Sequence, residues 1–589
     1  MSQILSPRDV EFLLFEWLDT PALFDRPRFA EHDADTARAL LELAESIATA
    51  DFAPHNRASD LQEPSFDGTT VTLLPEIAKA SSAFARAGFL AAPLPESAGG
   101  LQLPSSVFNA CMAWFQAAST GTAAYEMLTL AAANLLAEHG TPEQIETYVA
   151  PMLEGRFFGT MALSEPQAGS NLADITTRAE PQEDGTYRLF GRKMWISGGD
   201  HEMGENIVHL VLARTPDAPA GTRGISLFLV PKHLVEADGS IGERNDVVIA
   251  GINHKMGYRG TVNTAPVLGD GAFTPGGRPG AVGHLVGELH RGLPVMFTMM
   301  NEARVGVGLG ATALGYTGYL KSLAYARDRL QGRPVGVAAT EPQVALVDHP
   351  DVRRMLLAQK SYVEGALALE LYCSRLVDDA ASLEGAAADE ARSLLGLLTP
   401  IAKSWPSQWC LVANDLAIQV LGGAGYTRDH DVEQHYRDNR LNPIHEGTHG
   451  IQAQDLLGRK VLGDGGAALG LLLGRIRATT DAAPAEYAEP LLAAVDRLVE
   501  VTGRLGALGD PAAILADATA YLEATGHLVV AWLWLEQWRV AEGKEGAFYD
   551  GKRLAARYFL TRELPAVHPL LDLLERADRL TLDLDPGLL

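Results

Sequence analysis

Residues 161–170 read M-A-L-S-E-P-Q-A-G-S, and residues 191–199 read G-R-K-M-W-I-S-G-G. The first stretch follows an apolar run and ends in Gly and Ser, which favours a strand that leads into a turn. Such a turn offers backbone N–H groups and the hydroxyls of Ser164 and Ser170. In the second stretch, Trp195 and Ser197 have the alternate spacing that places two side chains on one face of a strand. A tryptophan considered alone is more often a core residue than a platform for a ligand. Together, the two stretches predict a β domain with a ligand-binding edge.

Short alternating or apolar runs surround these two stretches and support the same prediction. Gly, Pro and Asp punctuate the runs, and no long helical pattern separates them, which indicates a mostly antiparallel β domain. The predicted strands are residues 158–163, 186–190, 193–197, 207–213, 224–230, 247–252 and 264–267.

Helical patterns flank the β domain on both sides. On the N-terminal side, Thr141 followed by Pro142 is a clear helix start. On the C-terminal side, helix returns near Gly292 with long segments typical of a bundle. The run G-D-G-G at residues 463–466 interrupts regular structure before a further helical block. The sequence therefore predicts an α+β fold of four domains: an N-terminal helical domain (1–157), a middle antiparallel β domain (158–283), a helical-bundle domain (284–462) and an additional C-terminal helical domain (463–589).

Composition narrows the classes of function. The chain has 589 residues and a formal net charge of −26, and it contains no basic stripe, which argues against nucleic-acid binding. Cys111, Cys373 and Cys410 are far apart and form no CxxC pair, so we expect a reducing compartment. The N-terminus lacks the basic region of a signal peptide, and the apolar run 527–534 is too short to span a bilayer. We expect a cytoplasmic protein without stable membrane insertion.

Residues 444–452, I-H-E-G-T-H-G-I-Q, support two incompatible chemistries. His445, Glu446 and His449 spell H-E-x-x-H, in which a helix presents two zinc ligands and a glutamate that activates water. Pro443 and Gly447 both disfavour that helix. We therefore expect no metal, and a zinc hydrolase is only a remote alternative. In the favoured interpretation, Glu446 is a lone catalytic carboxylate followed by a Gly-Thr turn.

The run G-V-G-L-G at residues 306–310 is a second ambiguous motif. A glycine cluster binds pyrophosphate only between a strand and a helix, and the residues that precede this one are helical in character. Close packing of helices through small residues is the favoured interpretation.

The two β-domain stretches resemble the acyl-CoA dehydrogenase family, whose pattern is L-S/T-E-P-x-A-G-S followed by K-x-W-I-S/T. The resemblance covers roughly residues 75–460, and its motifs occur in family order. They continue through residues 300–304, 326–329, 419–426 and 436–438, and they end with the Glu-Gly-Thr at Glu446.

This resemblance implies FAD-dependent α,β-dehydrogenation of an acyl-CoA thioester to a trans-2-enoyl-CoA. Glu446 matches the base that removes the α-proton, while flavin N5 takes the β-hydride. Burial would raise the pKa of Glu446 and so make proton transfer feasible near pH 7. In some members the base lies immediately before the residue matching Arg304, but that position is Ala303 here. Glu302, one residue away, is expected to be a solvated or paired carboxylate.

The resemblance also assigns two sets of contacts. Arg329 is expected to reach the FAD pyrophosphate across a subunit interface, and Gln419 is expected near the adenine. The cofactor set is Leu163, Ser164, Trp195, Ile196, Ser197, Arg329, Gln419, Gly422, Gly423 and Thr448. The substrate set is Ser170, Asn301, Arg304 and Gly447.

Two departures from the family pattern leave alternatives open. His445 replaces a common tyrosine, either as a packing substitution or as a titratable neighbour that shifts Glu446. Residues 465–589 exceed the usual family length and resemble the added helical domain of a long bacterial subgroup that includes 3-methylmercaptopropionyl-CoA dehydrogenases. By analogy this extension favours a homodimer over a tetramer. Its tryptophans at positions 532, 534 and 538 are either membrane-interface anchors or, as we favour, buried between helices.

The electron acceptor has two candidates. The family implies electron-transferring flavoprotein as the partner, whereas an acyl-CoA oxidase would use the same Glu446 and flavin but pass electrons to oxygen.

Overall fold

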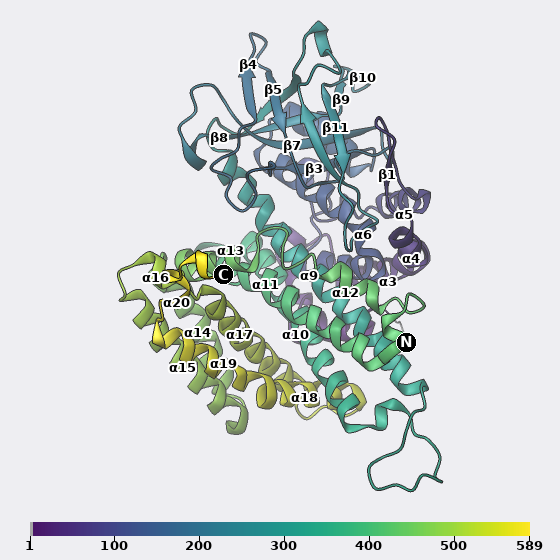
Figure 1. Cartoon of the computed structure of the whole chain (residues 1–589), viewed down its shortest axis with the longest axis vertical. Coiled ribbons are helices and arrows are strands. Elements are labelled where there is room, and N and C mark those ends of the chain that lie inside the picture. The colour runs from purple at the N-terminus through teal and green to yellow at the C-terminus, as the bar shows by residue number, and fades with distance from the viewer. Residues whose placement is uncertain (1–3) are drawn as a thin grey trace. The chain divides into compact units, whose positions relative to one another are not determined.

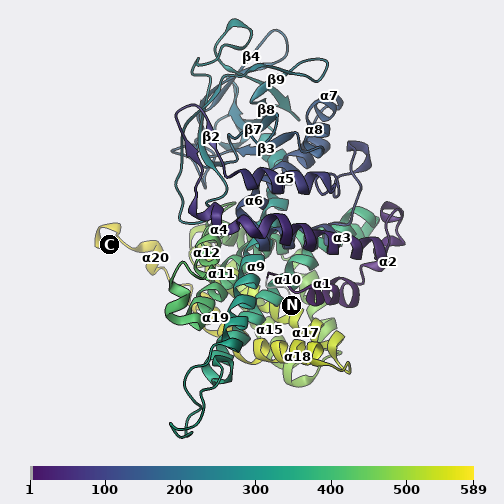
Figure 2. The same cartoon turned by 90° about the vertical axis from the view of Figure 1, so that its right-hand side faces the viewer.

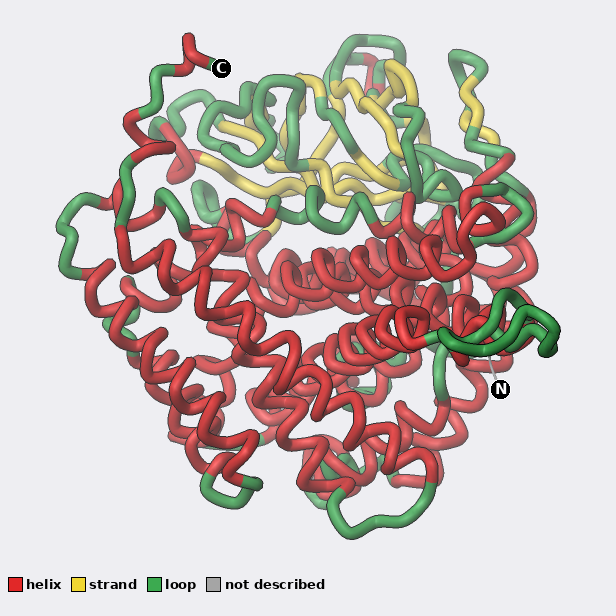
Figure 3. Tube along the Cα trace, turned by 60° about the horizontal axis from the view of Figure 1, so that its bottom comes forward, coloured by secondary structure: helices red, strands yellow, loops and turns green. Residues whose placement is uncertain are grey.

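The computed structural model describes residues 4–589 and all their side chains except those of residues 298, 299 and 301, so the predicted substrate contact of Asn301 lies outside the described side chains. The chain folds into two compact units. Unit 1 comprises the described part of Met1–Ala34, Ser105–Ala113 and Arg304–Leu589. Unit 2 comprises Asp35–Pro104 and Trp114–Ala303. Every named strand of the described chain belongs to unit 2, as the yellow segments of Figure 3 show.

Helices make up the N-terminal part of unit 2. The predicted start at Thr141 is confirmed, because its hydroxyl accepts from the Gln144 N–H at 3.2 Å while the Gln144 side chain accepts from the Thr141 N–H at 3.0 Å. This reciprocal pair satisfies two N–H groups that a helix start leaves open. The helices are α3 (Ala34–Ile47), α4 (Ala53–Leu61), α5 (Pro75–Arg86), the part of α6 (Ser105–His139) from Trp114 onward, α7 (Pro142–Gln144) and α8 (Ala150–Leu153).

A nine-stranded sheet forms the middle of unit 2. Its main path runs β11-β12-β5-β13-β8-β7-β3, with β4 beside β5 and β7, and β6 beside β12. The prediction of a mostly antiparallel domain is confirmed, although β3 and β7 pair in parallel over six residues. The strands are β3 (Phe157–Ala162), β4 (Arg178–Pro181), β5 (Tyr187–Arg192), β6 (Ile196–Ser197), β7 (Asn206–Arg214), β8 (Ile225–Pro231), β11 (Val247–Ile252), β12 (Asn263–Leu268) and β13 (Ala281–Val286).

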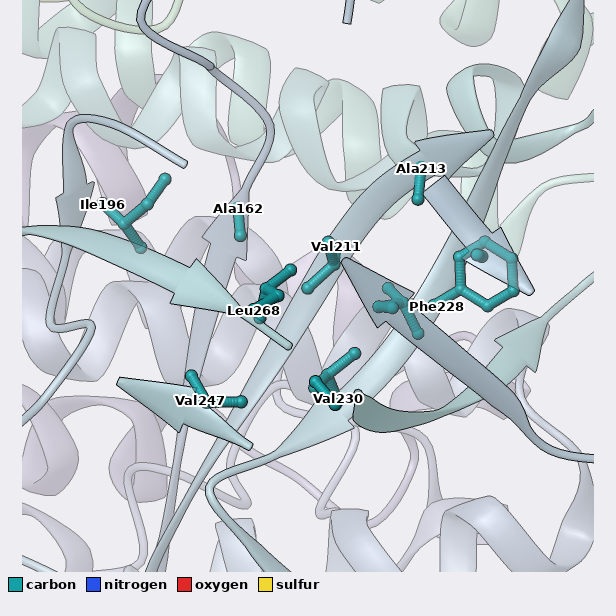
Figure 4. Packing of buried hydrophobic residues seen from close by; sticks show 11 residues of the cluster. Ala162, Ile196, Val211, Ala213, Phe228, Val230, Val247 and Leu268 are labelled. Carbon is teal, nitrogen blue, oxygen red and sulfur yellow. The ribbon is translucent and has the colours of Figure 1, made fainter. Parts of the chain in front are cut away.

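The sheet has a continuous apolar core, shown in Figure 4. All seven residues of β8 are buried, and so are all six of β3. Strands covered on both faces show apolar runs instead of strict alternation, which is why these two were predictable. The core side chains labelled in Figure 4 are Ala162, Ile196, Val211, Ala213, Phe228, Val230, Val247 and Leu268.

Long helices form the bundle of unit 1. They are α9 (Gly292–Asp328, in unit 1 from Arg304), α10 (Pro350–Ser382) and α11 (Gly385–Leu421), followed by α12 (Val432–Asn439) and α13 (His449–Gln454). The G-V-G-L-G run lies inside α9, where a side chain on Gly308 would overlap the carbonyl oxygen of Ala402 on α11. This contact confirms close helix packing at Gly308.

The C-terminal block also belongs to unit 1. Its helices α17 (Ala518–Ala541) and α18 (Ala547–Tyr558) lie against α10 (Figures 1 and 2). The indole N–H of Trp534 donates to the Ser361 carbonyl at 3.0 Å, and that of Trp532 donates to the Thr479 hydroxyl at 2.8 Å. Both rings are buried, so the membrane-anchor interpretation is wrong for them and the packing interpretation is confirmed. The other long helices of the block are α14 (Ala467–Thr480), α15 (Ala485–Gly506) and α19 (Val567–Arg576).

A buried charge network joins this block to the rest of unit 1. The Lys552 ammonium on α18 pairs with Glu364 on α10 at 2.9 Å and with Asp9 on α1 (Pro7–Glu11). Removing one partner of a buried ion pair strongly destabilises the folded protein, because the other charge stays buried without a partner. Across residues 4–589, no helix combines the length and apolar character that crossing a bilayer requires.

Candidate active site

The two sequence stretches of the β domain meet in the structure. Lys193 is fully buried, and its ammonium donates to the carbonyl oxygens of Leu163 at 3.0 Å and Leu212 at 2.8 Å. The N–H of Met194 donates to the Ser164 carbonyl at 3.0 Å. The predicted cofactor contacts Leu163 and Ser164 are therefore held beside the segment between β5 and β6 that carries Trp195.

Glu165 organises this turn, a role that the sequence analysis missed. Its carboxylate pairs with Lys193 at 3.0 Å and accepts from the backbone N–H of Thr176 at 2.7 Å and of Thr177 at 3.0 Å. The hydroxyls of both threonines and the Gln167 amide also donate to it. Burial opposes ionisation, but Lys193 and these donors outweigh burial and lower the pKa of Glu165 to about 2. The only sequence signal was a glutamate between a strand and Pro166.

Trp195 does not lie on a strand, so the prediction of alternate spacing with Ser197 is wrong. Its φ of 67° is left-handed, and β6 begins only at Ile196. This bend turns the indole outward, so that the residue is 62% exposed, while Ile196 is buried. The Ser197 hydroxyl accepts from the Asn263 amide at 3.2 Å. A flat aromatic surface open to solvent close to a half-buried hydroxyl fits an isoalloxazine ring.

The residues of unit 2 that lie on the predicted substrate side take part in fewer hydrogen bonds than those of the Glu165 turn. Ser170 is exposed at the end of its turn. The Glu302 carboxylate accepts from the Asn134 amide at 2.5 Å, which agrees with a paired carboxylate. Ala132 of α6 packs closely against Gly159 of β3.

In unit 1, Glu446 lies in a left-handed turn between α12 and α13. Its φ is 51° and that of Gly447 is 89°. The Gln452 amide donates to the Glu446 carbonyl at 2.9 Å, and the Thr448 side chain caps α13 by accepting from the Ile451 N–H. The helix therefore begins at position 449, after the first two residues of H-E-x-x-H. The zinc interpretation needs all of them on one helix, and this backbone excludes that arrangement.

Two buried cations lie near Glu446. The Lys403 ammonium on α11 donates to the carbonyl oxygens of Asn442 and Gly447, each at 2.7 Å. Arg304 pairs with Asp455 at 2.8 Å, with both side chains buried. Burial raises the pKa of Glu446, while Lys403 and Arg304 act in the opposite direction. The sequence analysis identified neither Lys403 nor Asp455, because neither belongs to a motif that it used.

The neighbouring histidines are neutral at pH 7. Burial, assisted by Lys403, lowers the pKa of His445 to about 3, and its ring contacts the Asn442 side chain at 3.0 Å. Burial, Lys403 and Arg440 lower the pKa of His449 to about 4. The lowered pKa of His445 favours the packing interpretation of this residue, and burial, Lys403 and Arg304 are the influences on the pKa of Glu446.

The remaining predicted cofactor residues form an exposed set at the far end of α11. Arg329, Gln419, Gly422 and Gly423 are all exposed. One apolar cluster contains residues from the end of α9 and the end of α11, so this set shares one end of the bundle. Gln419 follows Lys403 by sixteen positions on the same helix, which corresponds to about 24 Å. The structure thus separates this set from Glu446 within one chain.

Family models match almost the whole chain. They are the acyl-CoA dehydrogenase N-terminal domain at residues 34–156, the middle domain at 160–270 and the C-terminal domain at 290–461. A fourth, described as acetyl-CoA dehydrogenase C-terminal like, matches residues 472–585.

Curated relatives extend over the same length. The chain is 36% identical to a 3-methylmercaptopropionyl-CoA dehydrogenase of Ruegeria pomeroyi, with 95% of each chain covered. It is 35% identical to the broad-specificity linear acyl-CoA dehydrogenase FadE5 of Mycobacterium tuberculosis, with 98% of each covered. It is 28% identical to a subunit of the caffeyl-CoA reductase-Etf complex of Acetobacterium woodii, covering 64% of this chain and 87% of that one.

Solved structures share the fold. Caenorhabditis elegans ACDH-11 in complex with C11-CoA superposes with a TM-score of 0.76 at 18% identity, covering 95% of this chain and 91% of the other. An acyl-CoA dehydrogenase complexed with FAD from Bacillus anthracis superposes with a TM-score of 0.72 at 18% identity, covering 97% and 92%.

Proposed function

This chain belongs to the acyl-CoA dehydrogenase family, which uses FAD to introduce an α,β double bond into acyl-CoA thioesters, and on that premise we propose that Glu446 is its catalytic base. When bound, FAD accepts the hydride that leaves the β-carbon. The Glu446 carboxylate takes the proton from the α-carbon, and the electron pair of that C–H bond forms the new double bond. The product is a trans-2-enoyl-CoA.

The environment of Glu446 is the observation that carries this proposal. A carboxylate that deprotonates carbon near pH 7 needs a raised pKa but must still be ionised. Burial raises the pKa of Glu446, and the charges of Lys403 and Arg304 limit that rise. The backbone N–H of Glu446 is our candidate donor to the thioester oxygen, where negative charge develops as the proton leaves. Gly447 has no side chain to obstruct an acyl-CoA at this turn.

We assign the flavin ring to the β-domain edge. The exposed indole of Trp195 and the half-buried hydroxyl of Ser197 support this assignment. Leu163, Ser164 and Ile196 complete the contacts on that side. The proposed CoA contacts are Ser170, Asn301 and Arg304, of which Arg304 is engaged by Asp455 in this structure.

We further propose that the enzyme is a homodimer in which a second copy supplies the adenine-side contacts to FAD. The exposure of Arg329, Gln419, Gly422 and Gly423 supports this, as does their distance along α11 from the Glu446 turn. Thr448 is assigned a further FAD contact from the chain that carries the base.

For the physiological setting, we propose cytoplasmic fatty acid β-oxidation with electron-transferring flavoprotein as the acceptor. The Acetobacterium relative, named as a subunit of an Etf complex, supports that partner. The relatives named for 3-methylmercaptopropionyl-CoA and for linear acyl-CoA support an unbranched acyl group as the substrate class.

The test is turnover of the purified flavoprotein with a panel of acyl-CoA thioesters. We expect enoyl-CoA formation with ferricenium or electron-transferring flavoprotein as the acceptor and little peroxide in air. Peroxide release at the rate of enoyl-CoA formation would identify an oxidase instead. Absence of bound flavin would contradict the whole proposal.

A further inference from the structure

Lys403 is a fully buried cation in the middle of α11. Its side chain ends at the turn that follows α12, so two segments about forty residues apart in sequence meet at one ammonium group. A buried ammonium is costly unless its donors are satisfied. Here two of its three N–H groups donate to carbonyl oxygens, and neither acceptor belongs to a carboxylate.

The two acceptors bracket Glu446. The Asn442 carbonyl lies four residues before it, and the Gly447 carbonyl lies one residue after it. Between them the chain adopts the left-handed φ of 51° at Glu446, a conformation that a residue with a long side chain seldom occupies. Such backbone persists only where the surroundings hold it in place. The Lys403 ammonium is such a restraint, and the Gln452 amide at the Glu446 carbonyl is another.

The charge of Lys403 also acts on the carboxylate directly. The charged groups around Glu446 are Lys403 on α11 and Arg304 on α9, the latter neutralised in part by Asp455. Arg440, after α12, acts on His449, and the two histidines of the turn are neutral at pH 7. Burial lowers the pKa of Lys403 to about 7, and Glu446 acts against that shift. After burial, Lys403 is thus the larger of the two charge effects on the base, and unlike Arg304 it is not paired with another carboxylate.

We propose that Lys403 is a positioning residue for the dehydrogenation: it clamps the left-handed turn through the carbonyls of Asn442 and Gly447, and it keeps Glu446 ionised in the buried site. This inference rests on the proposed role of Glu446. Removing the clamp takes the ammonium donor from both carbonyls, of which Gly447 keeps only the Gln452 amide at 3.5 Å, and removes a positive charge from beside the base. The first effect lowers the rate, and the second shifts the pH at which the base works.

The experiment compares Lys403→Met, Lys403→Arg and the wild type by anaerobic single-turnover flavin reduction with a saturating acyl-CoA between pH 5 and about 9. For Lys403→Met we expect the rising limb of the rate to move up by about one pH unit, because a cation lowers the pKa of a nearby carboxylate. In parallel steady-state assays over a range of acyl-CoA concentrations, we expect kcat to fall more than about tenfold while KM changes little, since geometry at the base affects the reaction step. Lys403→Arg keeps the positive charge. The rising limb of its pH–rate profile should therefore stay at the wild-type pH, even where its reduction rate is lower.

A matched control is Lys552→Met, which removes another fully buried lysine of unit 1. This substitution should lower the thermal stability without moving the rising limb of the pH–rate profile. If Lys403→Met does not accumulate as a folded flavoprotein, Lys403→Gln replaces it, because the amide is neutral but can still donate to one carbonyl.

A pH profile of Lys403→Met that superimposes on the wild type would overturn the inference, even if the variant were less stable. The parallel Glu446→Gln variant separates this failure from that of the proposed function. If Glu446→Gln is inactive and Lys403→Met is unshifted, only the role of Lys403 is wrong. If Glu446→Gln still reduces the flavin, the base assignment itself fails.

Discussion

Replacing Glu165 with glutamine should destabilise the β domain of unit 2. Its ionised carboxylate pairs with buried Lys193 and accepts five further hydrogen bonds from Thr176, Thr177 and Gln167. Its pKa falls from 4.5 to about 2 on folding, a difference of about 2.5 units. At about 1.36 kcal/mol per unit, this corresponds to about 3 kcal/mol of stability at pH 7. This value agrees with the loss of about 3–5 kcal/mol of stability that typically follows the removal of one partner of a buried ion pair.

The pH dependence of this effect follows from the direction of the shift. Because the folded-state pKa is depressed, the stabilisation is fully present above the unfolded pKa of about 4.5 and is lost as the pH falls toward about 2. Glu165→Gln should therefore differ most from the wild type at neutral pH, and the difference should shrink below pH 4.5.

Hydrogen–deuterium exchange resolved by mass spectrometry measures this effect locally, without assuming that the whole chain unfolds as one unit. At pH 7 we expect peptides covering β3 and β5 to exchange about 100-fold faster in Glu165→Gln, the equivalent of about 3 kcal/mol. The control is Glu180→Gln, since Glu180 pairs with Arg178 on the surface and such pairs contribute little. Exchange in Glu165→Gln within about twofold of the wild type would refute the reasoning.

Three further substitutions test the packing and electrostatics of single elements. Gly308→Ala places a methyl group against the Ala402 carbonyl, so the bundle should lose about 1–3 kcal/mol and the Tm measured by calorimetry should fall; an unchanged Tm would show that α9 can shift without cost. Trp534→Phe removes the indole N–H that donates to the Ser361 carbonyl and puts a smaller ring in a fully buried place, so we expect about 1–3 kcal/mol of destabilisation and faster proteolysis within residues 463–589, and equal proteolysis would speak against this contact. Burial raises the pKa of Glu126 to about 8, so the folded state keeps a proton that the unfolded state loses above about 4.5, and stability should fall as the pH rises through that window. Glu126→Gln should flatten this fall in urea titrations, whereas parallel curves for variant and wild type would contradict the assignment.

Local sequence pattern was sufficient for much of the fold. Strands β3 and β7 were predicted to within one residue at each end, because each is a mostly apolar run with a glycine shortly before it and a proline shortly after it. Strand β4 was missed because its four residues, R-A-E-P, are two charged residues, an alanine and a proline. They form a strand only because they pair with β5. Edge pairing of that kind is a property of the sheet and leaves little trace in the segment itself.

In the candidate site, too, features carried by contiguous motifs were predictable, and features that depend on contacts between distant segments were not. Glu446 and Trp195 were identifiable because they belong to contiguous motifs, but the left-handed backbone at both positions was not, since neither is glycine. Lys403 escaped notice because its partners lie on a turn distant in sequence, and a lysine within a helix reads as a solvated side chain. The four-domain division of the chain stays a prediction.

The assignment of Glu446 as the base is tested most directly by single-turnover flavin reduction in Glu446→Gln. With flavin content equal to the wild type, we predict that anaerobic reduction by an acyl-CoA slows by at least about 10³-fold, within the range expected for loss of a general base. Glu302→Gln is the matched control, because burial also raises the pKa of that carboxylate, to about 7, but its bond to Asn134 engages it elsewhere and it should not be needed for proton removal. A Glu446→Gln enzyme that reduces its flavin within about tenfold of the wild-type rate would contradict the account.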